Sequence, residues 1–146
     1  MLQEAFHMFT KMLLAFDGSG GSYKALKTAI ELTRQHNSML CIITVALIPE
    51  FAEVRNGYNE EKEKAEKYYS RFLRYASEIS EKSGIKPVTY FELGKPTEEI
   101  VKKANEINAD LIVLGVNTEH PLKRRFLGGT GDPVVDYASC SVLIVK

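Results

Sequence analysis

The hydrophobic residues of this chain gather in five short runs that are separated by longer stretches of mixed polarity. The runs occupy residues 11–16, 39–47, 86–93, 110–115 and 141–146. Most of them are apolar throughout, without the alternation of a strand that has one face in water. Continuous runs of this length are typical of strands that are covered on both faces of a parallel sheet. The pattern therefore predicts five buried β-strands.

The stretches between the runs repeat their apolar residues every three or four positions, which is the period of an α-helix. The predicted helices span residues 22–36, 59–83, 96–108 and about 132–138. We expect Ser22 to cap the first helix, Gly84 to end the second and Pro96 to begin the third. The fourth helix should be short, with Asp132 as its N-cap and Pro133 as its first residue.

Strands and helices thus alternate from the start of the chain to its end. Because crossovers between parallel strands are right-handed, this order predicts an α/β fold, an open and doubly wound five-stranded parallel sheet with helices on both faces, Rossmann-like. We expect one domain over residues 12–146, preceded by an N-terminal appendage over residues 1–11. No internal repeat or linker interrupts this order.

Composition narrows the possible functions. The chain has 19 basic and 19 acidic residues and a formal net charge of zero, whereas a dedicated nucleic-acid binder usually carries a basic excess. No apolar run approaches the ~20 residues of a membrane span, and the first ten residues lack the features of a signal peptide. Cys41 and Cys140 lie in or beside apolar runs, so we predict two buried free thiols in a reducing cytoplasm. The three histidines show no metal-ligand spacing.

In a sheet of this kind, ligands bind at the carboxyl ends of the strands. Three segments reach that edge, at residues 16–22, 44–47 and 115–132. The first reads "FDGSGGS", but Tyr23 stands where a dinucleotide-binding GxGxxG motif has its third glycine. We interpret Gly20 and Gly21 as a tight turn into a capped helix. Asp17 ends a buried strand, so its carboxylate needs a hydrogen-bond donor. The donors are either the amides of the following turn or a ligand, through an amine or a ribose hydroxyl.

The segment 115–132 reads "GVNTEHPLKRRFLGGTGD" and lacks the GxxxxGK[ST] pattern of a Walker-type P-loop. It begins with a glycine where a strand ends, and "GGTG" at 128–131 precedes a predicted helix. Successive glycine amides at the start of a helix form an anion site. This segment is therefore the strongest candidate for binding phosphates.

Three segments of the chain are similar to the universal stress protein family. "LLAFDGSGGSYKAL" (13–26) resembles the family's first strand and turn, and "LGKPTEEIVKKANEINADLIVLG" (93–115) with "LKRRFLGGTGDPVVDYASCSVLIVK" (122–146) resembles its C-terminal half. The resemblance runs from Met12 to Lys146. It implies a small cytoplasmic regulatory protein, usually a homodimer, linked to stress survival and not to a defined reaction.

Family members that bind ATP carry a loop of the form G-x-x-G, nine residues, then G-[ST]. The present chain keeps the spacing, but Thr118 replaces the second glycine and Gly129 replaces the Ser/Thr, with Thr130 one residue later. Asn117 stands where many members have histidine. Threonine is a poor substitute if that position needs a positive φ, and one lost hydroxyl donor costs roughly 1.5–3 kcal/mol of phosphate binding. Lys123–Arg125 would offer cations to the phosphates or form a solvated basic edge.

The resemblance implies a set of nucleotide-binding residues. They are Asp17, Val45, Gly115, Asn117, Thr118, Gly128, Gly129 and Thr130. The first hypothesis is therefore a regulatory module that binds ATP, with Mg²⁺ as a bridging ion. The alternative is a member that no longer binds ATP and acts as a dimeric interaction protein. A slow nucleotide hydrolase is the third hypothesis, but no general base is positioned by the motif, so we predict no catalytic residue.

The last apolar run bears on the oligomeric state. If the strands follow the family's order 3-2-1-4-5, residues 141–146 form an edge strand. An apolar edge is an aggregation hazard unless it is paired. We therefore expect a homodimer in which this strand pairs antiparallel with a second copy. The edge residues are Val142, Leu143, Ile144 and Val145.

Overall fold

The computed structural model describes residues 8–47, 57–116 and 128–146, with the side chains of 57, 58, 61 and 128–132 outside the description. The strands are β1 (Lys11–Ala15), β2 (Met39–Ala46), β3 (Val88–Leu93), β4 (Leu111–Gly115) and β5 (Ser141–Val145). The helices are α1 (Gly20–His36), α2 (Gly57–Lys82), α3 (Pro96–Ile107) and α4 (Gly128–Tyr137). Within these residues no helix is long and apolar enough to cross a membrane.

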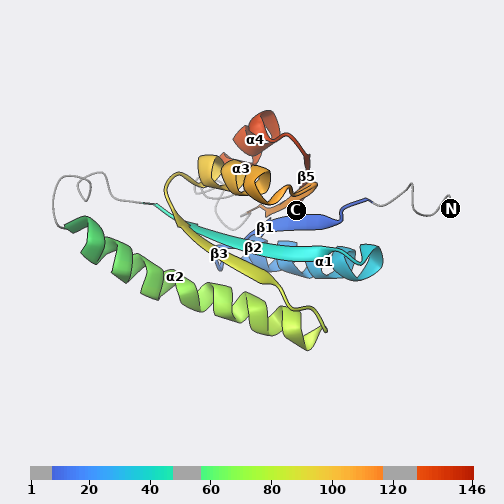
Figure 1. The fold of residues 1–146 in the computed structure, drawn as a ribbon, viewed down its shortest axis with the longest axis horizontal. Helices are drawn as coiled ribbons and strands as arrows, with labels where there is room; N and C mark the ends of the chain where they lie inside the picture. The colour runs from blue at the N-terminus through green and yellow to red at the C-terminus, as the bar shows by residue number, and fades with distance from the viewer. Residues whose placement is uncertain (1–7, 48–56, 117–127) are drawn as a thin grey trace.

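The five strands form one parallel sheet in the order β3-β2-β1-β4-β5. Helices α1 and α2 lie on one face of the sheet and α3 and α4 on the other (Figure 1). The predicted fold class and strand order are therefore confirmed. Strand β5 lies at one edge of the sheet, as expected for the last apolar run.

The sheet separates two hydrophobic cores. Along β1, Met12 and Leu14 point into the core under α1 and α2, whereas Leu13 and Ala15 point into the core under α3 and α4. All four side chains are buried. Burial on both faces explains why this strand is apolar from Met12 to Ala15 and does not alternate.

Helix α1 begins at Gly20, two residues before the predicted span, and its N-cap is Ser19, three residues before the predicted cap. The Ser19 Oγ accepts a hydrogen bond from the Ser22 amide at 3.2 Å, and the Ser22 hydroxyl donates to the Ser19 carbonyl at 2.8 Å. The prediction of Ser22 as the cap was wrong, because both serines can cap and the earlier one adds a turn. Gly20 and Gly21 therefore belong to the first turn of the helix, whose amides have no hydrogen-bond acceptor within the helix.

Helix α4 also begins earlier than predicted. It starts at Gly128 and contains Pro133 in its interior, so the predictions of Asp132 as N-cap and Pro133 as first helical residue were wrong. Val134 is fully buried and anchors the second half of the helix against the sheet. The glycine-rich segment 128–131 extends that helix toward its N-terminus. Pro133 lies inside the helix, where it removes the bond that its nitrogen would have donated and crowds the carbonyl four residues earlier.

The other helix boundaries agree with the sequence. Gly84 follows α2 with a φ of 81°, which is the left-handed conformation that glycine adopts at little cost. Pro96 begins α3 as predicted.

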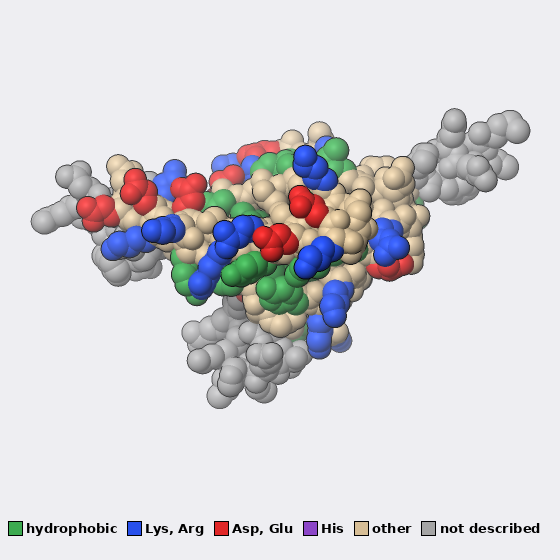
Figure 2. Space-filling view, turned by 90° about the horizontal axis from the view of Figure 1, so that it is seen from below, with side chains coloured by type: hydrophobic (Ala, Val, Ile, Leu, Met, Phe, Trp, Pro, Cys, Tyr) green, Lys and Arg blue, Asp and Glu red, His purple; other side chains and the backbone are tan. Residues whose placement is uncertain are grey.

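The outer side of α2 carries aromatic side chains that are covered by arginine. Tyr68 and Tyr75 are 50% and 41% exposed. The Arg71 guanidinium lies 4.2 Å from the ring centroid of Tyr68, and that of Arg74 lies 5.6 Å from the ring of Tyr75. Figure 2 shows apolar side chains between Lys and Arg side chains on this face. The guanidinium groups thus shield part of the aromatic surface from water.

Asp110 joins the first strand to the fourth at the amino-terminal edge of the sheet. Its carboxylate accepts from the backbone amides of Thr10 and Lys11 at 2.8 and 3.0 Å, and from the Thr10 hydroxyl at 3.2 Å. Its own amide donates to the Lys11 carbonyl at 2.9 Å. Phe9 also contacts the body of the domain, with its ring 5.5 Å from that of His36.

Candidate functional site

The loop that follows β1 holds Asp17 at the carboxyl edge of the sheet. Asp17 is half-buried, and its Oδ1 accepts a hydrogen bond from the Ser19 amide at 2.9 Å. Of the two roles left open by the sequence, the bond to the turn amide is the one observed. The second oxygen, Oδ2, has no hydrogen-bond partner among the described residues, so one acceptor of this carboxylate remains available for a ligand.

The next residue, Gly18, fixes the path of this loop. Its φ is 83°, and a Cβ placed on it would lie 2.5 Å from Cδ1 of Phe72. Both the backbone conformation and the contact with α2 require glycine here. The Phe72 ring therefore holds the loop that carries Asp17 and Ser19.

Gly115, at the end of β4, lies against the first turn of α1. A Cβ placed on Gly115 would overlap the Gly21 carbonyl group and lie 3.0 Å from the Ser22 amide nitrogen. Two segments that are distant in the sequence thus meet at the carboxyl edge. Only glycine permits this close approach of two backbones, so the role of Gly115 in the described structure is one of packing.

The side chain of Val45 is 4% exposed and packs in the core under α3 and α4, so only the backbone of Val45 can face the carboxyl edge. The Ile43 carbonyl accepts from the Phe16 amide at 2.9 Å, and the Ala46 carbonyl accepts from the Gly94 amide at 3.0 Å. Since backbone groups alternate sides along a strand, those of Val45 point toward β1, beyond the last residue of that strand.

Thr44 is a residue that the sequence analysis missed. Its buried hydroxyl donates to the Phe16 carbonyl at 2.7 Å, where the ladder between β1 and β2 ends. This bond fixes the position of the chain just before Asp17. The one hydroxyl within the apolar run 39–47 was the feature that could have revealed it.

The first turn of α4 contains Gly128, Gly129 and Thr130. The first four amides of a helix have no acceptor within the helix, and the helix dipole adds positive potential there. Helices α1 and α4 both follow parallel strands, so both begin on the carboxyl side of the sheet. Asn117 and Thr118 lie outside the described residues, as do Lys123–Arg125.

The cysteines are not arranged for chemistry. Cys41 is buried and Cys140 is half-buried, and both are free thiols. Burial raises the pKa of the Cys41 thiol, and burial together with the nearby Asp110 carboxylate raises the pKa of Cys140. A raised pKa lowers the fraction of reactive thiolate. The predicted free thiols are confirmed, although Cys140 is less buried than expected. The described residues also contain no group of three or more His, Cys, Asp or Glu that could hold a metal ion.

The fold and the site together define a Rossmann-like α/β domain with the N-termini of α1 and α4 and the Asp17 carboxylate at the carboxyl edge of its sheet. The model of the universal stress protein family matches residues 8–146. The chain belongs to this family.

Individual relatives agree with this assignment. Universal stress protein YxiE of Bacillus subtilis is 32% identical over an alignment of 155 residues. The alignment covers 95% of this chain and all of the relative. The solved structure of the hypothetical protein MJ0577 superposes with a TM-score of 0.83 at 27% identity, covering 95% of this chain and 96% of that one. A universal stress protein from Archaeoglobus fulgidus, solved in complex with dAMP, superposes with a TM-score of 0.64 at 22% identity, covering 95% and 99% of the two chains.

Proposed function

We propose that this protein is a regulatory module that binds an adenine nucleotide at the carboxyl edge of β1, β2 and β4. The observation that carries the proposal is the contact between Gly115 and the Gly21 carbonyl, because it brings the glycine-rich N-terminus of α1 against the end of β4. The dAMP complex of the relative from Archaeoglobus fulgidus supports adenine as the base to test first.

The phosphates would lie at the first turn of α4. The amides of Gly128, Gly129 and Thr130 are free of intrahelical acceptors and suit an anion. Mg²⁺ would bridge the phosphates of ATP. Asn117 and Thr118 would complete this side of the site by resemblance to the family.

The nucleoside would lie over the ends of β1 and β2. Asp17 Oδ2 would accept from a ribose hydroxyl or an adenine amine, and the backbone groups of Val45 would pair with the edge of the base. We assign the protein a binding role in regulation and no catalytic activity, because the described part of the site offers backbone groups and one carboxylate, without a base beside them that activates water.

The test is thermal unfolding with and without millimolar Mg·ATP. Ligand at about 100 times Kd stabilises a protein by roughly 2.7 kcal/mol, which is a rise of about 5–10 °C for a chain of this length. We expect this rise in the wild type, a smaller one in Asp17→Ala, and an equal or larger one in the double variant Thr118→Gly, Gly129→Ser, which restores the family motif.

The variants separate the two hypotheses. A rise only in the restored variant would mean that the present loop has lost its ligand and that the protein acts through its surfaces. No rise in either the wild type or the restored double variant would refute the nucleotide proposal.

Strand β5 supports a second proposal, a homodimer. It is an edge strand, and Val142, Leu143, Ile144 and Val145 are half-buried in the single chain. Pairing with a second copy would satisfy the outward backbone groups and cover the apolar side chains. This proposal holds whether or not ATP binds.

A further inference from the structure

A polar groove lies at the amino-terminal edge of the sheet, at the other end of the strands from the site described above. It has a volume of about 490 Å³ and lies between the end of α1, the start of β2 and the turn that follows α2. Its polar lining includes Thr33, Arg34, Asn37, Ser83 and Lys86. No acidic side chain is among the described residues that line it. The groove therefore offers hydrogen-bond donors and two cations, and the Glu31 carboxylate, which lies 3.9 Å from Arg34, is outside its lining.

One lining side chain lacks the partner that its burial demands. Thr33 is 4% exposed, and its Oγ1 is buried without a hydrogen-bond partner among the described residues. A buried hydroxyl without a partner is costly and uncommon. A threonine in a helix populates two χ1 rotamers, so this hydroxyl can turn to donate to a group in the groove.

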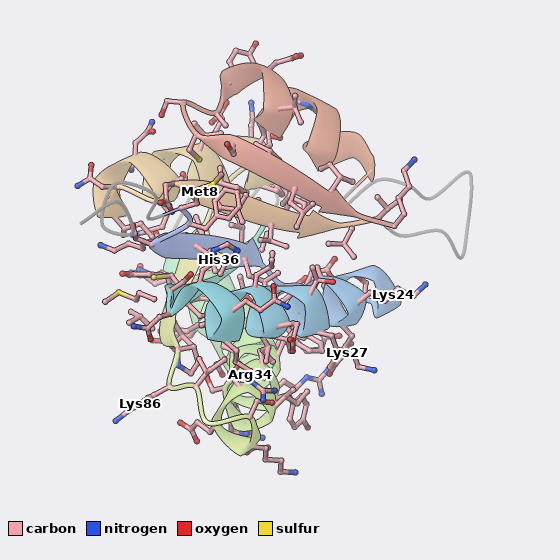
Figure 3. All side chains as sticks on the ribbon, turned by 90° about the vertical axis from the view of Figure 1, so that its right-hand side faces the viewer. Met8, Lys24, Lys27, Arg34, His36 and Lys86 are labelled. Carbon is pink, nitrogen blue, oxygen red and sulfur yellow. The ribbon has the colours of Figure 1, made fainter. Side chains whose placement is uncertain are left out.

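The two cations come from different elements that border the groove. Arg34 is on the last turn of α1, and Lys86 lies between α2 and β3 (Figure 3). The Arg34 guanidinium is 3.9 Å from the Glu31 carboxylate, and both side chains are 60% exposed. An exposed pair at that separation is weak, so Arg34 remains available to a ligand.

Two helices end beside the groove, and their dipoles oppose an anion. Each helix C-terminus carries about half a negative charge, so the helix ends and the Glu31 carboxylate together formally offset the two cations. The terminal carbonyls are also occupied: Thr33 O accepts from the Asn37 and Ser38 amides, and Ser80 O accepts from the Ser83 and Ile85 amides. An anion is therefore favoured locally and not by net charge, because the described lining residues include two cationic donors and a hydroxyl and no acidic side chain.

We propose that this groove binds the oxyanion group of a small ligand, a phosphate or a carboxylate, between Arg34 and Lys86 with the Thr33 hydroxyl as a third donor. The site is independent of the proposed nucleotide site, because the two lie at opposite ends of the strands. Charge-assisted bonds from Arg and Lys supply most of the affinity, and the hydroxyl fixes the orientation of the anion.

The experiment is a two-dimensional ¹H–¹⁵N NMR titration of the whole chain with sodium phosphate and, separately, with sodium succinate. Sodium chloride holds the ionic strength constant. We expect saturable shifts of the amides in 33–40 and 83–86 with at least one anion, and the anion that binds more tightly identifies the group. Absence of saturable shifts at these amides with both anions would overturn the proposal.

Variants test the named side chains. Arg34→Gln with Lys86→Gln should weaken binding more than tenfold, and Thr33→Val should weaken it about tenfold while leaving the fold intact, since valine has the same shape. The matched control is Lys24→Gln with Lys27→Gln, two exposed cations of α1 outside the lining of the groove (Figure 3). An unchanged affinity in either groove variant, or an equal loss in the control, would contradict the assignment.

Discussion

Gly115 at the end of β4 lies in direct contact with the carbonyl group of Gly21 in the first turn of α1. Neither backbone can move aside without displacing a buried strand or a helix start. We therefore predict that Gly115→Ala destabilises the fold by about 1–3 kcal/mol or more, as overpacking does. Urea unfolding measures the change.

The matched control for that substitution is Gly84→Ala. Gly84 has a φ of 81° but no atom within 4 Å of an added Cβ, so alanine there costs only the conformational strain of about 1–2 kcal/mol. A loss of stability in Gly115→Ala that is smaller than in Gly84→Ala would show that the contact between β4 and α1 yields easily.

Gly18 and Phe72 should be energetically coupled. Gly18→Ala adds a Cβ that collides with the Phe72 ring and also strains a positive φ. In a Phe72→Ala background the collision disappears and only the strain remains, so we expect Gly18→Ala to cost at least 0.5 kcal/mol less there. A double-mutant cycle by thermal unfolding measures the difference, and strictly additive effects would mean that the ring does not hold the loop.

Asp110→Asn should destabilise the protein by about 1–3 kcal/mol. The substitution replaces one carboxylate oxygen by an NH₂ group that faces the amide donors of Thr10 and Lys11, so one donor loses its acceptor. Urea unfolding beside the exposed variant Asp136→Asn, for which we expect a change within about 0.5 kcal/mol, tests this. Equal stability of the two variants would exclude a structural role for the Asp110 carboxylate.

Both thiols should react slowly with iodoacetamide at pH 8 in the folded protein. Their pKa values are raised, mainly by burial, so the protonated thiols favour the folded state below the unfolded pKa, and this contribution is lost as the pH rises through the folded pKa. Mass spectrometry should show faster labelling in urea and, in the folded state, labelling of half-buried Cys140 before buried Cys41. Labelling of folded Cys140 at the unfolded rate would contradict the raised pKa.

The proposed dimer can be tested by removing one outward amide. The Val145 carbonyl accepts from the Val116 amide at 3.0 Å, so the backbone of Val145 faces β4 and, by alternation, that of Ile144 faces outward. Ile144→Pro should therefore yield a folded monomer, because it removes an N–H that only a second copy could use. Ile144→Ala is the control, since it loses the same side chain and keeps the amide. Sedimentation of both variants as the same species would refute pairing through β5.

The sequence predicted the fold because the parts of strands that are buried on both faces must be apolar, as Met12–Ala15 of β1 are. It misplaced the starts of α1 and α4, because Ser19 and Ser22 are equally good caps by chemistry and the packing of Val134 outweighs the preference of Pro133 for the first turn. The contact of Gly115 with Gly21 could not be predicted either, since it depends on how a helix and a strand approach each other in space.

The bonds of Asp110 to Thr10 and Lys11 have a consequence for the order in which the chain can fold. Strand β1 is the first to leave the ribosome, yet one of its two neighbours is β4, about a hundred residues later. Until then β1 has one open edge, and the growing chain holds an unfinished sheet. Pairings of such long range slow folding and expose strands to wrong partners. The nascent chain is therefore exposed to wrong strand pairings until residues 111–115 have emerged and can pair with β1.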